Sequence, residues 1–124
     1  MLQNTVNVIG PGLIPHLRAG DKPGMMMPIV LTFDRKRQAG AVITVQDRAI
    51  IAWEQGRFRV KLAAEVIPFA AVTEIKRGTR QSEDPTKPLD TIEFTAAKAW
   101  DLSAPQTTGA RRAALHHLGD LLEG

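Results

Sequence analysis

Apolar and polar positions alternate along most of the chain after residue 28, in short runs that are separated by turn residues. Strict alternation puts apolar side chains on one face of a β-strand, and closely spaced turns are typical of consecutive antiparallel strands. The pattern predicts seven strands, at residues 28–33, 41–45, 49–53, 57–66, 72–76, 91–96 and 99–103. Two polar runs, Asp34 to Gly40 and Gly78 to Pro88, are predicted to be loops.

The last segment changes to a helical period. Apolar side chains recur there at spacings of three and four, at Ala114, Leu115, Leu118, Leu121 and Leu122. This spacing predicts an amphipathic helix over residues 109–122, with Thr107 or Thr108 as its N-cap. Because such a helix must bury its apolar stripe, we expect it to pack on the apolar faces of the strands. The sequence therefore predicts a mainly β (α+β) fold of seven antiparallel strands and one C-terminal helix.

The first 27 residues are rich in proline and glycine and end in the run Met25-Met26-Met27. Proline removes a backbone donor and glycine is conformationally free, so a long regular element is not expected here. We expect an irregular segment, residues 1–27, whose apolar side chains cover an open end of the sheet. Residues 28–124 are expected to form the folded domain.

Length and composition restrict the class of protein. The chain has 124 residues, of which 44% are hydrophobic and 23% charged, as in a globular domain with one core. No stretch approaches the roughly 20 apolar residues that a membrane-spanning helix needs. Cysteine is absent, and the N-terminus lacks the pattern of a secretory signal. These features favour a cytoplasmic protein.

Charge is concentrated in the middle of the chain. Residues 35–80 hold ten basic and four acidic residues, whereas the whole chain has a net charge of +3. In the stretch GRFRVKL, three cations alternate with apolar residues, at Arg57, Arg59 and Lys61. This charged side is either a solvent-facing strand face or a surface for an anion or an acidic partner. The second interpretation requires the strand to lie beside the basic run Arg35-Lys36-Arg37.

Candidate catalytic and metal-binding residues are few. Ser82 and Ser103 do not stand in a nucleophile pattern, and no glycine-rich phosphate loop precedes a helix. His116 and His117 are adjacent and point about 100° apart on a helix, so they do not chelate one ion together. Trp53 and Trp100 have apolar neighbours and are expected in the core. With aromatic residues at 5% and no tyrosine, nucleic acid is not an expected partner. We expect neither an enzyme nor a bound metal or cofactor.

The order of elements is similar to that of the pleckstrin-homology superfold, in which a C-terminal helix plugs one end of a seven-stranded barrel. Residues 40–53, GAVITVQDRAIIAW, resemble the strand–Thr–Asp–Arg–strand hairpin of bacterial pleckstrin-homology-like (PH-like) domains. Residues 65–75, EVIPFAAVTEI, resemble the isoleucine-proline link of that family. The resemblance covers residues 28–122. Ala49 stands where the family usually has a basic residue, and the N-terminal segment lies outside the core fold.

The resemblance implies a PH-like barrel and a binding role. Eukaryotic members bind inositol phosphates through basic residues around the first hairpin loop, a position matched here by Arg35, Lys36 and Arg37, with Arg59 or Lys61 nearby. We expect a non-catalytic binding or assembly module that recruits a protein partner or a second copy of itself. The alternative is peripheral attachment to anionic membrane lipids through the set Arg35, Lys36, Arg37, Arg57, Arg59 and Lys61. A small-molecule site at the barrel mouth is a third alternative.

Overall fold

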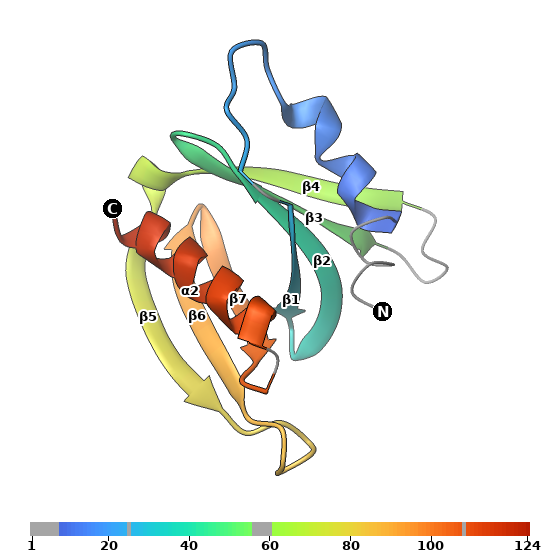
Figure 1. The fold of residues 1–124 in the computed structure, drawn as a ribbon, viewed down its shortest axis with the longest axis vertical. Coiled ribbons are helices and arrows are strands. Elements are labelled where there is room, and N and C mark those ends of the chain that lie inside the picture. The colour runs from blue at the N-terminus through green and yellow to red at the C-terminus, as the bar shows by residue number, and fades with distance from the viewer. Residues whose placement is uncertain (1–7, 25, 56–60, 108) are drawn as a thin grey trace.

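The computed structural model describes residues 8–24, 26–55, 61–107 and 109–124. These residues form seven strands in one antiparallel sheet, followed by one C-terminal helix, α2 (Gly109–Glu123) (Figure 1). The strands are β1 (Met27–Phe33), β2 (Lys36–Thr44), β3 (Arg48–Gln55), β4 (Lys61–Pro68), β5 (Thr73–Arg80), β6 (Leu89–Ala96) and β7 (Lys98–Pro105). Their order in the sheet is β4-β3-β2-β1-β7-β6-β5. The predicted mainly β class, the antiparallel strands and the terminal helix are confirmed.

The sheet is strongly curved but not closed. Within the described residues β4 and β5 form its two edges and do not pair with each other. Consecutive hairpins make up each half, and the halves meet where β1 pairs with β7 at Val30–Ser103 and Leu31–Leu102. A closed barrel, which the family resemblance implies, is therefore not what these strands form.

The two predicted loops are shorter than expected. Lys36 to Gly40 belong to β2, and the connection to β1 is a two-residue turn, Asp34-Arg35, whose φ angles are 49° and 66°. Two successive left-handed residues give a hairpin turn whose twist matches that of the strands, so the strands continue up to it despite their polar sequence. Similarly, Gly78 to Arg80 lie in β5, which leaves only residues 81–88 between β5 and β6.

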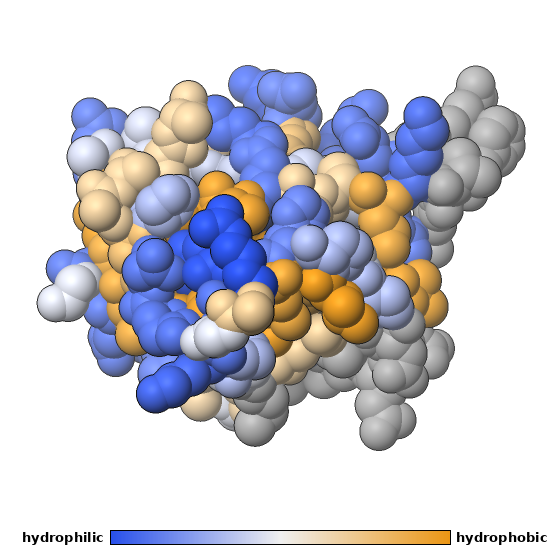
Figure 2. Space-filling model, turned by 90° about the horizontal axis from the view of Figure 1, so that it is seen from above, coloured by the Kyte–Doolittle hydropathy of each residue, from blue (hydrophilic) through white to orange (hydrophobic). Residues whose placement is uncertain are grey.

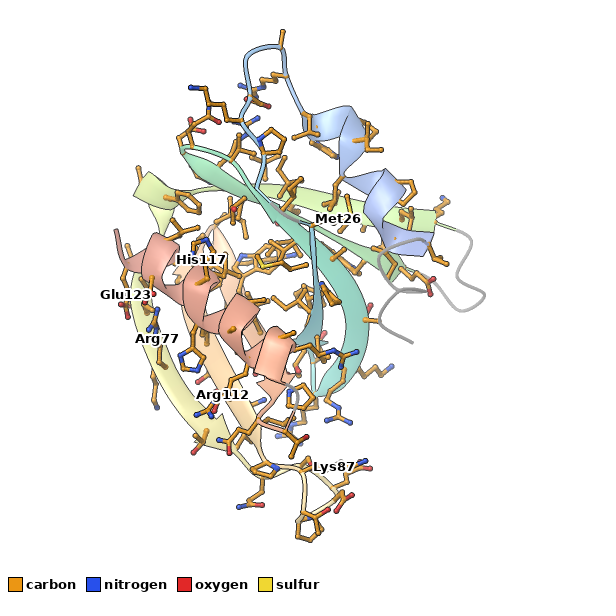
Figure 3. All side chains as sticks on the ribbon, in the orientation of Figure 1. Met26, Arg77, Lys87, Arg112, His117 and Glu123 are labelled. Carbon is orange, nitrogen blue, oxygen red and sulfur yellow. The ribbon has the colours of Figure 1, made fainter. Side chains whose placement is uncertain are left out.

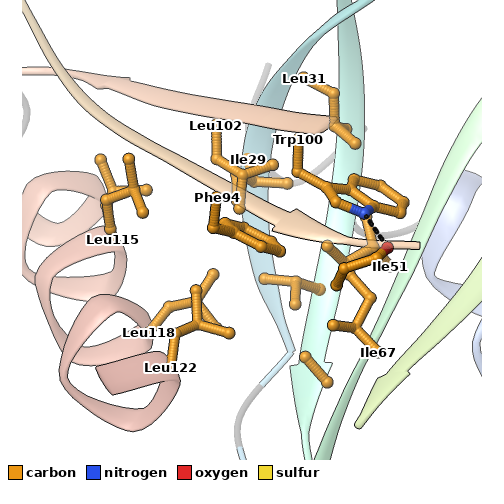
Figure 4. Packing of buried hydrophobic residues seen from close by; sticks show 14 of the residues in the cluster. Ile29, Leu31, Ile51, Ile67, Phe94, Trp100, Leu102, Leu115, Leu118 and Leu122 are labelled. Carbon is orange, nitrogen blue, oxygen red and sulfur yellow. Dashed lines mark hydrogen bonds between the residues drawn. The ribbon is translucent and has the colours of Figure 1, made fainter. Parts of the chain in front are cut away.

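Helix α2 covers the concave face of the sheet. Its leucine ridge is buried against apolar side chains of β1, β6 and β7, as predicted (Figure 4). The ridge consists of Leu115, Leu118 and Leu122. On the sheet side, Figure 4 shows Ile29, Phe94 and Leu102 facing it. Burying each such side chain contributes about 1.5–3 kcal/mol, so this contact holds the helix in place.

The N-terminal segment packs on the opposite face of the sheet. It contains two short 3-10 helices, η1 (Gly10–Gly12) and η2 (Ile14–His16), which lie across β2, β3 and β4 on the side away from α2 (Figure 1). Ile9 and Leu13 are buried there in a second core. Its other buried members are Ala41, Ile43, Val45, Ile50 and Ala52. The segment thus covers a face of the sheet, whereas the sequence led us to expect that it covers an open end.

An ion pair ties this segment to the sheet. The guanidinium of Arg48 donates hydrogen bonds to Asp21 at 2.6 Å and to Asp47 at 3.0 Å. The hydrogen bond from Arg48 lowers the pKa of the Asp21 carboxyl, so both groups stay charged at neutral pH. Because the Arg48 side chain is buried, losing Asp21 would leave a buried cation with less compensation.

No described helix is long and apolar enough to cross a lipid bilayer.

Gly40 marks the point where the sheet bends. Strand β2 pairs with β1 from Lys36 to Val42, but with β3 only from Gly40 to Thr44, so it leaves β3 at Gly40. A Cβ at this position would collide with a methyl group of Leu31 and lie 2.9 Å from the carbonyl oxygen of Ala52. Only glycine therefore fits between the two neighbouring strands.

We predict that Gly40→Ala lowers the free energy of unfolding by about 1–3 kcal/mol, the usual cost of overpacking a core. The matched control is Gly78→Ala in β5, whose Cβ would meet only the Thr91 hydroxyl at 3.6 Å. Urea unfolding followed by tryptophan fluorescence measures both. Equal midpoints for the two variants would contradict the role given to Gly40.

Candidate functional site

A wide, open groove of about 1240 Å³ runs along the sheet at the end that α2 leaves uncovered. One wall is the β1–β2 hairpin end, including Asp34, Arg35 and Arg37. The other wall comes from β5, β6 and β7, and aromatic residues of β1, β3, β6 and β7 contribute to the lining. A drug-sized ligand site usually measures about 300–1,000 Å³ and is more enclosed, so the shape suits a longer ligand better.

Charges of both signs line the groove, and some are already neutralised. Arg80 pairs with Asp101 at 2.8 Å and lies 3.7 Å from Glu93. Three cations, by contrast, have no ion pair with any residue in the described ranges. They are Arg35, Arg37 and Lys76. An anionic group that enters the groove would find these cations on both walls. It would also meet Asp34, Glu74 and Glu83, which have no ion pair within the described ranges either.

Four aromatic rings form one cluster beneath the groove. Trp100 contacts the other three rings, with centroids 5.8 Å from Phe33, 6.0 Å from Trp53 and 6.2 Å from Phe94. Its indole N–H donates a hydrogen bond of 3.2 Å to the backbone carbonyl of Ala96 (Figure 4). Trp53 and Trp100 are 7% and 2% exposed, as expected for core residues. The cluster is consequently a rigid floor with fixed ring orientations.

Lys98 lies over this floor. Its ammonium nitrogen is 4.6 Å from the ring centroid of Trp100, 4.9 Å from that of Phe33 and 5.3 Å from that of Trp53. The same nitrogen pairs with the Glu65 carboxylate at 2.8 Å. Lys98 belongs to β7 and Glu65 to the edge strand β4, and the curvature of the sheet brings them together. One ammonium therefore contacts three aromatic rings and one carboxylate.

Of the six cations proposed from the sequence, the structure describes four, and these four do not all line the groove. Arg35 and Arg37 line the groove, whereas Lys36, between them, is exposed and does not. Lys61 begins β4, well away from the β1–β2 turn (Figure 1). Arg57 and Arg59 lie outside the described residues. Lys76, Lys98 and the aromatic floor were not proposed as site residues, although each ring was visible as an apolar strand position.

A second cluster lies between α2 and β6. The carboxylate of Asp90, whose side chain is 7% exposed, accepts hydrogen bonds from Arg112 at 2.6 Å and Gln106 at 2.8 Å. His116 Nε2 lies 2.9 Å from the same carboxylate. Figure 3 shows Arg112 on the side of α2 that faces β5 and β6, with Arg77 further along. A small pocket of about 270 Å³ adjoins the cluster.

The electrostatics of this cluster favour a structural role. Burial raises the pKa of Asp90, but hydrogen bonds from His116, Arg112 and Gln106 more than offset it, so the pKa is lowered overall. A carboxylate beside a histidine can orient the imidazole as a base, yet the hydroxyls in the pocket wall belong only to Thr79 and Thr91. The described residues contain no group of three metal-ligating side chains. Asp90 therefore mainly fixes α2 to the sheet.

Sequence reasoning missed Asp90. His116 was expected at the surface, and its side chain is 51% exposed, but the spacing to Asp120 was noted instead of Asp90. Asp120 pairs with Arg77 at 2.8 Å. Arg112 and His116 are four residues apart and share one face of the helix, which is the available signal that a common acceptor lies opposite. The acceptor itself lies one residue before the predicted strand 91–96.

No protein-family model and no curated protein matches the chain. Among solved structures, it is similar to the crystal structure of the C-terminal domain of an unknown protein from Leishmania infantum, with a TM-score of 0.62 and 12% sequence identity. The match covers 93% of this chain and 95% of that one. At this identity it shows that the two share a fold.

We predict that Asp90→Asn lowers the free energy of unfolding by about 1–3 kcal/mol at about pH 7. Because the folded pKa lies below the ordinary 3.8, the stabilisation is present above that pH and is lost as pH falls through the lower, folded value. Chemical unfolding of both proteins between about pH 7 and pH 2 should show the difference shrinking only below 3.8.

Asp120→Asn is the control, because Asp120 is 71% exposed and forms a surface ion pair. Such pairs contribute roughly 0–1 kcal/mol. If Asp120→Asn lowered the free energy of unfolding as much as Asp90→Asn does, the result would contradict the role given to the buried Asp90 carboxylate.

Proposed function

We propose that the chain is a non-catalytic binding module of PH-like type that holds an extended segment of a partner protein in the groove. The observation that carries this proposal is the set of unpaired cations on the two groove walls, Arg35, Arg37 and Lys76. They flank an open hollow instead of the enclosed cavity that small-molecule binding needs.

The PH-like assignment is supported by the arrangement of elements. Seven antiparallel strands in consecutive hairpins precede one helix, and the helix buries its leucine ridge on the concave face. The sheet bends at Gly40 and leaves its two edges unjoined. In this assignment the groove is the mouth of an incompletely closed barrel, and residues 8–24 are an addition on the outside.

The free edge of β5 supports an extended peptide as the ligand. Among the described strands β5 pairs only with β6, so the backbone groups on its other side, along Lys76 to Arg80, have no strand partner there. The register shifts between Thr73 and Lys76, where Glu74 has a φ of 56°, so regular pairing is available only beyond that point. An added strand would receive main-chain hydrogen bonds from the edge, while its acidic side chains contact the unpaired cations.

Self-association through the N-terminal segment has less support. Of the apolar residues in that segment, Ile9 and Leu13 are buried against the sheet, whereas Val8 is 55% and Ile14 60% exposed. Larger apolar side chains that stay exposed include Ile14 and Leu62. Seen from above, hydrophobic side chains lie in separate spots among hydrophilic ones (Figure 2). Attachment to an anionic membrane is likewise less favoured, because the described cations point to different surfaces.

We predict that peptides selected from a random displayed library for binding to the full chain contain acidic residues and depend on Arg37. Charge reversal, Arg37→Glu, should lower the affinity for such a peptide by about tenfold or more, because a charge-assisted hydrogen bond is replaced by repulsion between two negative charges. Fluorescence anisotropy with the labelled peptide measures the affinity.

Lys36→Glu is the matched control, since it makes the same change in net charge one residue away and outside the groove. Affinity should change little for this variant. If both reversals weakened the peptide equally, or neither did, the groove would not be the binding site.

A further inference from the structure

We propose that the cage formed by Phe33, Trp53 and Trp100 binds a methylated lysine side chain of the partner segment, and that Lys98 occupies this cage in the free protein. The inference rests on the proposed function, because all three rings and Lys98 line the groove. It adds the chemical group that the groove recognises.

The rings are arranged to contact a cation from several sides. Trp53 and Trp100 meet at 80°, and Phe33 is inclined by 50° to the first and 64° to the second. Rings at such angles enclose a space, and their negative faces attract a cation placed within about 6 Å. The Lys98 ammonium meets this criterion for all three rings, at 4.6–5.3 Å. The cage therefore already holds an ammonium group, that of Lys98.

The present occupant indicates the shape of the ligand. The two indoles are 7% and 2% exposed with Lys98 in place, so a ligand contacts the rings only after this side chain is displaced. A choline headgroup within a bilayer would have to bring the membrane surface into a curved sheet, which the groove walls obstruct. We therefore assign the site to a lysine side chain on a peptide.

Glu65 indicates the degree of methylation. Its carboxylate accepts a hydrogen bond of 2.8 Å from the Lys98 ammonium. A dimethylammonium keeps one N–H for this carboxylate and turns its methyl groups to the rings. A trimethylammonium has no N–H to donate, and an unmodified ammonium is strongly hydrated and costs more to desolvate. The expected order of affinity is dimethyl, then trimethyl, then unmodified lysine.

In the free protein, the side chain of Lys98 itself fills the cage. Its side chain is 41% exposed and that of Glu65 is 42% exposed, so the lysine can turn into solvent without opening the core. A ligand must displace this side chain before it can bind. Its apparent affinity is therefore lowered in proportion to the small fraction of protein molecules in which the cage is free. Removing the Lys98 ammonium should therefore strengthen binding, which is the reverse of what a purely structural lysine would do.

The test uses N-acetyl-dimethyllysine amide as the probe and the full chain as the protein. Because Trp53 and Trp100 are the two tryptophans of the sequence, both indole N–H signals in a proton–nitrogen NMR spectrum report on the cage. We expect these signals to move on titration, and Lys98→Ala to bind the probe at least about tenfold more tightly than the unmodified protein. Lys36→Ala, which removes an exposed lysine outside the groove, should bind like the unmodified protein.

Two further variants keep the test decisive. Lys98→Gln retains most of the side-chain length without the charge, so it should also bind more tightly even if Lys98→Ala folds poorly. Glu65→Met, made together with Lys98→Gln, removes the carboxylate acceptor and should therefore remove the preference for the dimethylated over the trimethylated probe.

Unmoved indole signals in all folded variants, or equal affinity with and without the Lys98 ammonium, would overturn the inference. Equal or tighter binding of free choline than of the lysine derivative would overturn the assignment to a peptide lysine. If unmodified library peptides still bound in an Arg37-dependent manner after such a result, the groove would remain a peptide site without a methyl-lysine cage.

Discussion

Burial of β2 and β3 on both faces is the constraint on which the rest of the structure depends. From Gly40 to Thr44 and from Arg48 to Trp53, every residue is buried. A sheet of this kind needs a cover on each side, which α2 provides on the concave face and the N-terminal segment on the other. No described residue of the helix lines the groove, which draws on core positions such as Phe94 and on the alternating positions Glu93 and Asp101 of the same strands.

The curvature of the sheet then determines what the groove contains. β2 leaves β3 at Gly40 and continues beside β1, which swings the β1–β2 turn towards β5, β6 and β7. The same curvature places Lys98 of β7 next to Glu65 of β4, although three strands separate β7 from β4 in the sheet. The aromatic cluster fills the space between the leucine ridge and this ion pair, so it belongs both to the core and to the groove.

Much of the fold could be predicted from local patterns. The apolar spacing of Leu115, Leu118 and Leu122 located the helix and its buried face, and alternation located all seven strands. The packing of the N-terminal segment on the face opposite α2 was not predicted, because the runs 41–45 and 49–53 were interpreted as strands that are buried on one face only. They are apolar at nearly every position, which indicates burial on both faces.

The candidate site was less predictable, because it depends on contacts between distant strands. Arg35 and Arg37 were proposed from their basic run, but only the two-residue turn at Asp34 and Arg35 directs them to the groove while Lys36 stays outside. Lys98 lies between Ala97 and Ala99, at the gap between the predicted strands 91–96 and 99–103, and no sequence pattern marks it as a site residue. Its contacts with three rings and with Glu65 arise from the bend at Gly40, which no local pattern reports.

The position of Lys98 is the central claim that a single measurement can test most directly. NMR of the full chain, with the side-chain protons of Lys98 assigned, reports on whether its terminal methylene lies against aromatic rings. The structure predicts a marked upfield ring-current shift of the Lys98 ε protons and nuclear Overhauser contacts to Phe33, Trp53 and Trp100. Chemical shifts typical of a solvent-exposed lysine, with no such contacts, would contradict the account.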